Sequence, residues 1–491
     1  MNQRGFYQPE GAWVGDVIPW QEGGVFHLFY LHETRRTPKE GMPWHRVLTE
    51  NLVDFTEAGE AIASGGHSSE DHNIYTGSIV LDGNGTHHAF YTGQNPALCG
   101  EDGIPLQVVM HATSRDGMVS WQRHSSDTFG ATAGYETADW RDPFVFWDED
   151  AQLWRMLITA RHAQGPARRR GVIAQCTSYD LTSWEPAPPF WDPRRYIAHE
   201  CPEVFQWGDW WYLVYSEFSD AFTTRYRMAR SLHGPWIVPE HDTIDGRAYY
   251  AAKSAERDGH RFFFGWIASR EGATDDGAWQ WAGTLSVLEA EQCEDGTLAF
   301  HPTTDLRQTF SEPIDEIAAG TALCAPDGYA DALTPAEAPA AFRLVARFDI
   351  AEHTNECGVL LRASADGNEG YVLRLEPKRG RLVFDRWPRC GTGTEQWQIS
   401  GDVPFAVELE RPCTLDPGEH EIEVIVDGDI CVATVDNATV LSTRLYDRQT
   451  GLVGAFVGEG AVTIKEFSVF TRTNERSASR TSENHLLAAA T

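Results

Sequence analysis

The sequence predicts an all-β protein, a five-bladed β-propeller followed by a C-terminal β-sandwich. A recurring phrase, a small polar residue and a turn followed by an aromatic side chain, supports the propeller. Its aromatic residues fall at Phe55, Trp121, Trp184 and Trp236, at intervals of 66, 63 and 52 residues. Each interval can hold four short strands with their turns, which is typical of a propeller blade. Later in the chain, alternating short strands over about 130 residues are typical of a two-sheet sandwich.

The propeller is predicted over residues 1–305. Apolar runs such as Val25–Leu31 and Trp154–Thr159 alternate there with turn clusters such as Asp82–Gly85. Four copies of the phrase and a closing segment, 261–288, predict five blades. An array of ordinary sandwiches would explain the strands but not the regular spacing of the aromatic residues.

The remainder divides into three parts. Residues 306–340 are predicted to be a linker, because 334–341 is rich in Ala and Pro. Residues 341–472 contain runs such as Phe342–Phe348 and Glu421–Val426, which predict the sandwich. The polar and then Ala-rich end, 473–491, is predicted to be a disordered tail.

Composition limits the partners and the location. The formal net charge of −32 argues against nucleic acid and against anionic membrane surfaces. No apolar run of membrane-spanning length and no secretory signal is visible, and the nine Cys include no Cys-x-x-Cys pair. These features predict a cytoplasmic protein with no metal site and no cofactor. The oligomeric state stays open, and a homo-oligomer is allowed.

Three acidic stretches carry the functional prediction. Asp16, Asp142 and Glu200 lie in different repeats, each at the start of an apolar strand run. Inner strands of a propeller line one central funnel, so the three carboxylates are expected to converge. Neighbouring carboxylates raise one another's pKa, and such a cluster needs a reason. A pair that flanks a glycosidic bond supplies one, since one carboxylate attacks while the other acid protonates the leaving oxygen.

These stretches resemble glycoside hydrolase family 32, the invertase, inulinase and levanase group. Arg141-Asp142-Pro143 resembles the family's Arg-Asp-Pro motif, Glu200-Cys201-Pro202 its Glu-Cys motif, and Asp16 the nucleophile of its first motif. Smaller matches are Tyr75–Ser78, Tyr91–Gln94, Gly265-Trp266 and Trp281–Leu285. The resemblance runs from Phe6 to Thr471 and implies the same propeller and sandwich.

The resemblance also implies a reaction, the retaining hydrolysis of terminal β-fructofuranosyl groups from oligosaccharides. Asp16 would be the nucleophile, Glu200 the general acid/base and Asp142 the transition-state stabiliser. Substrate-binding candidates are Arg141, Trp13, Tyr75, Ser78, Trp140, His199, Cys201 and Trp281. Trp279, His72 and Asn73 are further candidates, although core packing or a turn explains each of them as well. Glu203 competes with Glu200, but three residues along a strand it should point to the opposite face.

One departure concerns the substrate. The family's first motif has Asn before the nucleophile, whereas Gly15 stands there in this chain. Glycine has no side chain that can donate a hydrogen bond to a sugar hydroxyl. An unusual fructoside, a difructose anhydride or another furanoside therefore remains open as the substrate.

Three alternatives remain. Fructosyl transfer, or the formation or hydrolysis of difructose anhydrides, would use the same covalent intermediate. An inverting arabinofuranosidase-like enzyme would hold its carboxyl groups farther apart. A non-catalytic carbohydrate-binding propeller would be expected to lack one of the three acids. The Ser-x-x-Glu pattern by which some family members contact a partner's substrate is absent around 426–434, so the sandwich is predicted to be structural.

Overall fold

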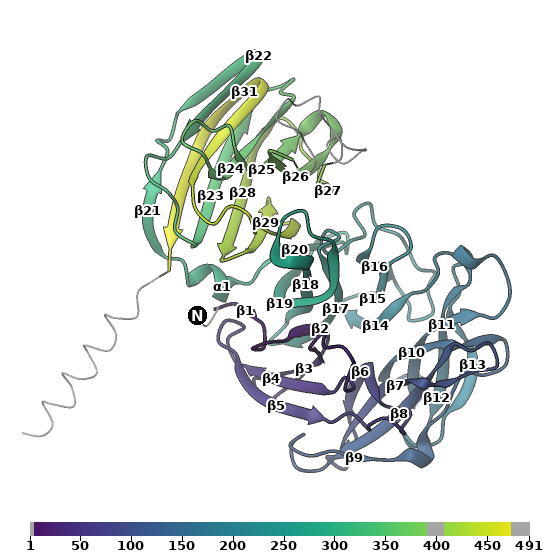
Figure 1. Ribbon diagram of the computed structural model, residues 1–491. Coiled ribbons are helices and arrows are strands. Elements are labelled where there is room, and N and C mark those ends of the chain that lie inside the picture. Colours follow the sequence, from purple (N-terminus) through teal and green to yellow (C-terminus); the bar gives the residue numbers. More distant parts are fainter. Residues whose placement is uncertain (1–3, 390–406, 473–491) are drawn as a thin grey trace, which may run out of the picture. The chain divides into compact units, whose positions relative to one another are not determined.

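A computed structural model describes residues 4–389 and 407–472 as strands joined by short turns (Figure 1). The all-β class is confirmed, since the α-helix of the described residues is a single turn, α1 (Thr304–Gln308). The chain divides into two compact units. Unit 1 comprises Met1–His301 and Ala438–Thr443, and unit 2 comprises Pro302–Asn437 and Arg444–Thr491. No helix of the described residues has both the length and the apolar character needed to cross a membrane.

Unit 1 consists of antiparallel groups that follow one another along the chain. Three of them form separate sheets: β6 (Asn73–Leu81), β7 (His87–Cys99), β8 (Pro105–Ser114) and β9 (Gln122–Arg123); β10 (Tyr135–Asp148), β11 (Leu153–His162), β12 (Gly171–Ser178) and β13 (Glu185–Trp191); and β14 (Glu200–Trp207), β15 (Trp210–Glu217) and β16 (Thr223–Ala229).

A fourth sheet joins the two ends of unit 1. It has the order β17 (Tyr249–Arg257), β18 (His260–Arg270), β19 (Trp279–Gln292), β2 (Trp13–Glu22), β3 (Val25–Glu33), β4 (Trp44–Thr49) and β5 (Thr56–Ile62). The short strands β1 (Phe6–Tyr7) and β20 (Leu298–Pro302) pair with β19. The pairing of Gly283 with Val14 brings the last group against the first.

The first strands of successive groups contact one another. β2 lies against β6, β6 against β10, β10 against β14, β14 against β17, and β17 against β2. These contacts close a ring, so residues far apart in the sequence meet where the five strands begin. We call these five the ring strands.

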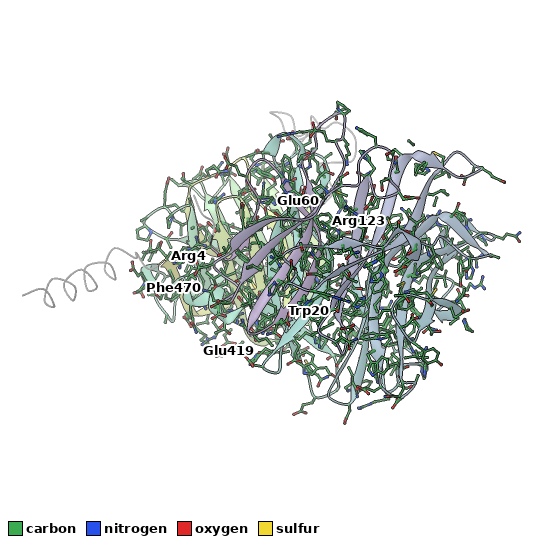
Figure 2. All side chains as sticks on the ribbon, turned by 90° about the horizontal axis from the view of Figure 1, so that it is seen from below. Arg4, Trp20, Glu60, Arg123, Glu419 and Phe470 are labelled. Carbon is green, nitrogen blue, oxygen red and sulfur yellow. The ribbon has the colours of Figure 1, made fainter. Side chains whose placement is uncertain are left out.

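The spaced aromatic residues fill the layers between neighbouring groups. Phe55, Trp121, Trp184 and Trp236 each pack against a different cluster of buried apolar side chains. Their regular spacing therefore reflects one recurrent packing position. Polar contacts add to these layers: Arg123, labelled in Figure 2, donates from β9 to the buried carboxylate of Asp71 at 2.8 Å.

Unit 2 is a second antiparallel assembly. Its strand order is β27 (Leu409–Pro412), β26 (Arg381–Trp387), β25 (Gly370–Glu376), β24 (Glu356–Ala363), β31 (Leu452–Thr471), β23 (Ala341–Ile350), β28 (Gly418–Asp427) and β29 (Ile430–Val435). Most of β30 (Thr439–Arg444) falls in the stretch assigned to unit 1. The expected alternation is present in β23, where Phe342, Leu344 and Phe348 are fully buried while Arg343 donates to Glu423.

The linker expected over 306–340 requires correction. This segment contains β21 (Glu312–Glu316) and β22 (Ala322–Leu333), which both pair with β31. β31 has 20 residues and is long enough to pair with several strands along both of its edges. Its backbone supplies the hydrogen-bond partners for β21 and β22, which the Ala-rich segment 334–341 does not signal. The tail predicted over 473–491 lies outside the described residues.

Candidate active site

Every ring strand carries an irregularity in its pairing with the next strand. The register shifts between Val14 and Val17 in β2, Tyr75 and Gly77 in β6, Arg141 and Phe144 in β10, Glu200 and Glu203 in β14, and Tyr250 and Lys253 in β17. A bulge places two residues against one and re-aims a side chain. Asp142 and Cys201 accordingly adopt positive φ, at 56° and 49°, which is uncommon outside glycine. Asp16, Asp142 and Glu200 all lie at these irregularities.

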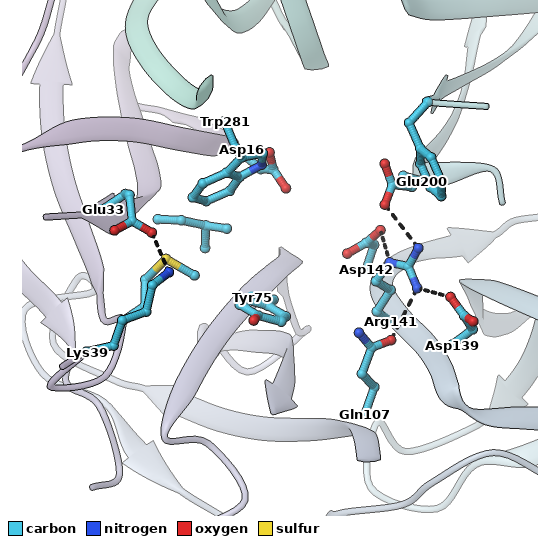
Figure 3. Close-up of a pocket in the computed structure, with 13 residues that line it drawn as sticks. Asp16, Glu33, Lys39, Tyr75, Gln107, Asp139, Arg141, Asp142, Glu200 and Trp281 are labelled. Carbon is cyan, nitrogen blue, oxygen red and sulfur yellow. Dashed lines mark hydrogen bonds and ion pairs between the residues drawn. The ribbon is translucent and has the colours of Figure 1, made fainter. Parts of the chain in front are cut away.

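A cavity of about 580 Å³ opens where the bulges meet (Figure 3). We call it the carboxylate pocket. It is lined by Asp16, Leu31, Glu33, Lys39, Met42, Tyr75, Gln107, Asp139, Arg141, Asp142, Glu200, Phe218 and Trp281. The three acids singled out in the sequence thus share one pocket, together with the candidates Arg141, Tyr75 and Trp281.

Asp16 is held by three donors from other ring strands or their neighbours. Thr76 Oγ1 donates to its Oδ2 at 2.5 Å, and Trp266 Nε1 donates to its Oδ1 at 3.1 Å. The Cys201 thiol lies 3.7 Å from Oδ2. Burial raises the pKa of Asp16, and the charge of Asp142 raises it further, while the Thr76 bond lowers it. These donors orient a carboxylate that can act as a nucleophile.

Asp142 is buried and uses one oxygen for structural contacts. Its Oδ2 accepts hydrogen bonds from Thr159 Oγ1 and from the backbone N–H of Cys201, both at 3.0 Å. Its own N–H donates to Thr92 Oγ1 at 2.8 Å. Asp142 is therefore rigidly positioned, and among the described residues Oδ1 is left without a donor and is available to a bound hydroxyl.

Glu200 lies between a cation and a phenol. Arg141 Nη2 donates to its Oε1 at 3.0 Å, and Tyr250 OH donates to its Oε2 at 2.7 Å. Burial raises the pKa of Glu200, the Arg141 charge opposes this rise, and the charges of Asp142 and Asp16 add to it. A raised pKa suits an acid that must keep its proton until the leaving group needs it.

Arg141 connects the acids on one wall of the pocket. Besides Glu200, its guanidinium binds Asp139 at 2.5 Å and Gln107 at 3.2 Å through Nη1. Its Nε lies 3.8 Å from Asp142 Oδ2. The surrounding carboxylates raise the pKa of Arg141 even though burial lowers it, so the residue is a fixed positive charge.

Five of the expected substrate-binding residues lie outside the pocket lining. Trp140 is buried in the core between β6–β9 and β10–β13, and Ser78 joins β6 to β10 through Pro143 O and Val145 N, at 2.9 Å each. His199 is fully buried against Trp191, Tyr196 and Tyr215. Trp13 lies under the guanidinium of Arg35, and Cys201 lies behind Asp16. None of these five side chains is therefore part of the carboxylate pocket lining.

The other candidates also lie outside the lining. Trp279 packs under the guanidinium of Arg270. His72 is buried and stacked on His67, and Asn73 donates to Gln94 at 2.8 Å. Glu203 accepts hydrogen bonds from the backbone N–H and the hydroxyl of Ser254, at 2.7 and 2.6 Å. Its buried carboxylate is thus already occupied.

Comparison with known proteins identifies the family. Residues 6–302 match the model of the glycosyl hydrolases family 32 N-terminal domain, which is more than half of the chain. The chain belongs to glycoside hydrolase family 32. It is 24% identical to the levanbiose-producing levanase of Bacillus subtilis over 457 residues, 87% of this chain and 81% of that protein. It is 25% identical to the levanase of the same organism over 309 residues, 57% of this chain but only 43% of the levanase.

Solved structures agree in fold. The exo-inulinase of Aspergillus awamori superposes with a TM-score of 0.76 at 18% identity, covering 96% of this chain and 99% of that one. Fructan 1-exohydrolase IIa of Cichorium intybus superposes with a TM-score of 0.74 at 16% identity, covering 96% and 97%. At this level of identity the likeness shows the fold of this family 32 chain.

The absence of a side chain at Gly15 is matched by the position of Trp281 in this family 32 member. A Cβ atom built on Gly15 would lie 2.6 Å from Cη2 of Trp281 and 2.9 Å from Leu31 Cβ. The indole of Trp281 therefore occupies the space beside the backbone that a side chain at position 15 would need. It packs edge-on against Trp266, 6.1 Å away, and lines the carboxylate pocket.

Several residues in or beside the pocket were not identified from the sequence. Tyr250 stands at the bulge of β17 as Glu200 does at the bulge of β14, but Tyr249-Tyr250-Ala251-Ala252 has no acid to signal it. Gln107 and Asp139 hold Arg141, and Lys39 pairs with Glu33 at 2.9 Å. Among the described residues, no group of three or more His, Cys, Asp or Glu is arranged to hold a metal ion.

Proposed function

We propose that this protein is a retaining glycosidase that removes terminal β-fructofuranosyl residues from oligosaccharides. One observation carries the proposal: Asp16, Asp142 and Glu200, from three different groups of strands, line a single pocket. Membership of family 32 supports the same reaction class.

In the proposed first step, an oxygen of Asp16 forms a bond to the anomeric carbon while the bond to the leaving oxygen breaks. Glu200 gives its proton to that oxygen. In the second step a water molecule gives a proton to Glu200, and its oxygen displaces Asp16 from the anomeric carbon. Asp142 Oδ1 and the Arg141 guanidinium would hold hydroxyl groups of the furanose ring. The hydrogen bonds on Asp16 fix the nucleophile in place.

Fructans are the substrate class that we propose. The relatives and similar structures are named as levanases, an exo-inulinase and a fructan exohydrolase. Trp281 over Gly15 supplies an aromatic wall beside Asp16, where the terminal ring would be held. A wall of this kind favours stacking of a sugar face.

We also propose that unit 1 is a five-bladed propeller and that unit 2 is a β-sandwich. The closed ring of contacts among β2, β6, β10, β14 and β17 supports five blades. The pairing of β19 with β2 joins the groups at the two ends of the unit. β21 and β22 pair with β31 in addition to β23 and β24. This extra pairing supports a second layer of sheet in unit 2.

A cytoplasmic location remains part of the proposal. No disulfide joins two cysteines of the described residues, which fits a reducing compartment. Cysteine usage says nothing about assembly, and the homo-oligomer allowed by the sequence stays open.

The test is a panel of sucrose, inulin, levan oligosaccharides, difructose anhydrides and arabinofuranosides, with all products identified. Release of fructose from chain ends is expected, with the β-anomer formed first when the reaction is followed by NMR. First formation of the α-anomer would contradict retention. Predominant transfer products at high substrate concentration would instead favour a fructosyltransferase. A hexosyl adduct on the peptide that contains Asp16 would identify the nucleophile.

A further inference from the structure

Lys253 is a buried lysine that takes no part in the proposed reaction as described above. It ends the bulge of β17, and only 2% of its surface is exposed. Its ammonium donates one hydrogen bond, from Nζ to the backbone oxygen of Gly77 at 2.7 Å, and forms no ion pair with any of the described residues. Burying a charge without a partner costs free energy, so its presence inside the protein needs an explanation.

The side chain of Lys253 reaches across the ring of strands. In that ring β17 contacts β14 and β2. The ammonium nevertheless binds Gly77 of β6, and it lies 5.7 Å from the centroid of the Phe144 side-chain ring in β10. In the order of the ring, β6 and β10 are the two strands on the far side from β17. The charge of Lys253 therefore lies inside the ring, and not in a layer between neighbouring groups of strands.

The hydrogen bond of Lys253 connects it to the proposed nucleophile. Its acceptor, Gly77, follows Thr76, and the Thr76 hydroxyl donates to Asp16 Oδ2 at 2.5 Å. Both contacts are made at the bulge of β6, where the register shifts between Tyr75 and Gly77. Consecutive residues of one strand thus hold the ammonium of Lys253 and the carboxylate of Asp16.

The charged groups near Asp16 come from three other ring strands. Asp142 lies on β10, Glu200 and the Cys201 thiol lie on β14, and Lys253 lies on β17. Burial raises the pKa of Asp16 and the charge of Asp142 raises it further, whereas the charge of Lys253 lowers it. Of these groups, Lys253 is the cation.

Two further groups face the ammonium, and both lie on β14. Burial raises the pKa of Cys201 and that of Glu203, and the charge of Lys253 opposes both rises. Glu203 is already bound by the backbone N–H and the hydroxyl of Ser254. Of the two carboxylates that face Lys253, Asp16 is the one that lines the carboxylate pocket.

We propose that Lys253 is a positioning residue for the reaction, a positive charge inside the ring that keeps the nucleophile Asp16 ionised beside Asp142 and Glu200. The proposal rests on the glycosidase function proposed above. A carboxylate must be an anion to attack, and neighbouring acids disfavour the anion. Lys253 does not line the carboxylate pocket, so its charge acts through Asp16 without competing for the hydroxyl groups of the sugar.

Two substitutions separate the charge of Lys253 from its hydrogen bond. Lys253→Met removes the charge and the donor, whereas Lys253→Gln removes the charge and keeps an N–H donor. In both variants the pKa of Asp16 should rise, because the cation is lost. We expect the acidic limb of kcat/KM on a levan or inulin oligosaccharide to shift to higher pH by about 0.5–1 pH unit, while the basic limb moves much less.

A second measurement needs no substrate. NMR of the side-chain carboxyl carbon, in protein with isotope-labelled aspartate, follows the titration of Asp16, and its signal is the one that disappears in Asp16→Asn. We expect its midpoint to move upward in both Lys253 variants, by the same amount as the acidic limb. Thermal unfolding shows whether each variant is folded, and the Gln variant carries the test if the Met variant does not fold.

Arg261→Met is the matched control. The Arg261 guanidinium donates to Ser254, the neighbour of Lys253, at 2.8 Å, and its charge acts on Glu203. Arg261 does not line the carboxylate pocket. This variant should lose thermal stability and keep the wild-type acidic limb and the wild-type midpoint of Asp16.

Each outcome supports or overturns a stated claim. An unchanged Asp16 midpoint in the folded Lys253 variants would overturn the proposal. A wild-type midpoint in the Gln variant alone would assign the effect to the hydrogen bond on Gly77, and the role of the charge would be wrong. An equal displacement in Arg261→Met would show that loosened packing is the cause. If wild type released no fructose while the midpoint still moved, the glycosidase function would be contradicted and the coupling of Lys253 to Asp16 would stand.

Discussion

The backbone N–H of Cys201 donates a 3.0 Å hydrogen bond to Oδ2 of Asp142, although 59 residues separate them. The bond is made where β10 and β14 both bulge, and Cys201 reaches it with a φ of 49°. It fixes Glu200, the neighbour of Cys201, relative to Asp142. Glu200, the proposed acid, and Asp142, the proposed stabiliser, are therefore positioned by the same contact.

Glu200→Gln should lower activity, whereas Glu203→Gln should lower stability. The first removes the proposed acid, and kcat should fall about 10²–10⁴-fold. The second disturbs a carboxylate that binds Ser254 outside the pocket, so unfolding free energy should fall by about 1–3 kcal/mol while kcat stays near wild type. Steady-state kinetics and thermal unfolding of both variants measure this.

A fructoside with a good leaving group provides the control. Because such a group needs little protonation, Glu200→Gln should lose much less activity on it than on sucrose. Equal losses on both substrates, or inactivity of a folded Glu203→Gln protein, would contradict the assignment.

Tyr250→Phe should move the basic limb of the pH profile. The phenol donates to the Glu200 carboxylate and so lowers the pKa of Glu200. Without this bond the pKa of Glu200 rises, the acid keeps its proton to higher pH, and the basic limb of kcat/KM shifts upward by about one pH unit. Tyr249→Phe is the matched control, because the Tyr249 hydroxyl donates to Phe263 O and not to a pocket acid. A shift to lower pH would refute the role given to Tyr250.

Thr76→Val should move the acidic limb of the pH profile. The Thr76 hydroxyl donates to Asp16 and lowers its pKa, so its loss should raise the pKa of Asp16. A nucleophile must be ionised, and the acidic limb of kcat/KM should shift to higher pH while the basic limb moves much less. Thr284→Val is a suitable control, since this buried threonine donates to Gln8. An unchanged acidic limb would show that Asp16 is not the group titrating there.

The sequence was sufficient to predict that Asp16, Asp142 and Glu200 come together in one pocket and that the strands repeat. The acids stand next to apolar strand runs, and the aromatic spacing follows from packing between neighbouring groups. The bulges could not be predicted, because they depend on pairing with the next strand. Without them, Tyr250 could not be recognised as the partner of Glu200.

For two of the candidate residues that lie outside the pocket lining, the reason is geometric. Trp140 and His199 directly precede Arg141 and Glu200, and successive side chains of extended backbone point to opposite faces. Arg141 and Glu200 face the pocket, so their neighbours enter the cores between groups of strands. The linker prediction failed for a different reason, since β21 and β22 form by pairing with a distant strand, β31.

Gly15→Ala should disturb Trp281. The new Cβ would lie 2.6 Å from the indole, so the ring must move or the backbone must strain, and kcat/KM should fall with a loss of about 1–3 kcal/mol in unfolding free energy.

Trp281→Ala removes the ring that blocks the methyl group. A Gly15→Ala/Trp281→Ala protein should therefore be more stable than the sum of the single effects predicts, with a coupling of about 0.5–3 kcal/mol. Thermal or denaturant unfolding of the four proteins gives the cycle. Since Leu31 Cβ also lies within 2.9 Å of the built atom, recovery should be partial. Strict additivity would mean that the packing of Trp281 does not depend on the glycine.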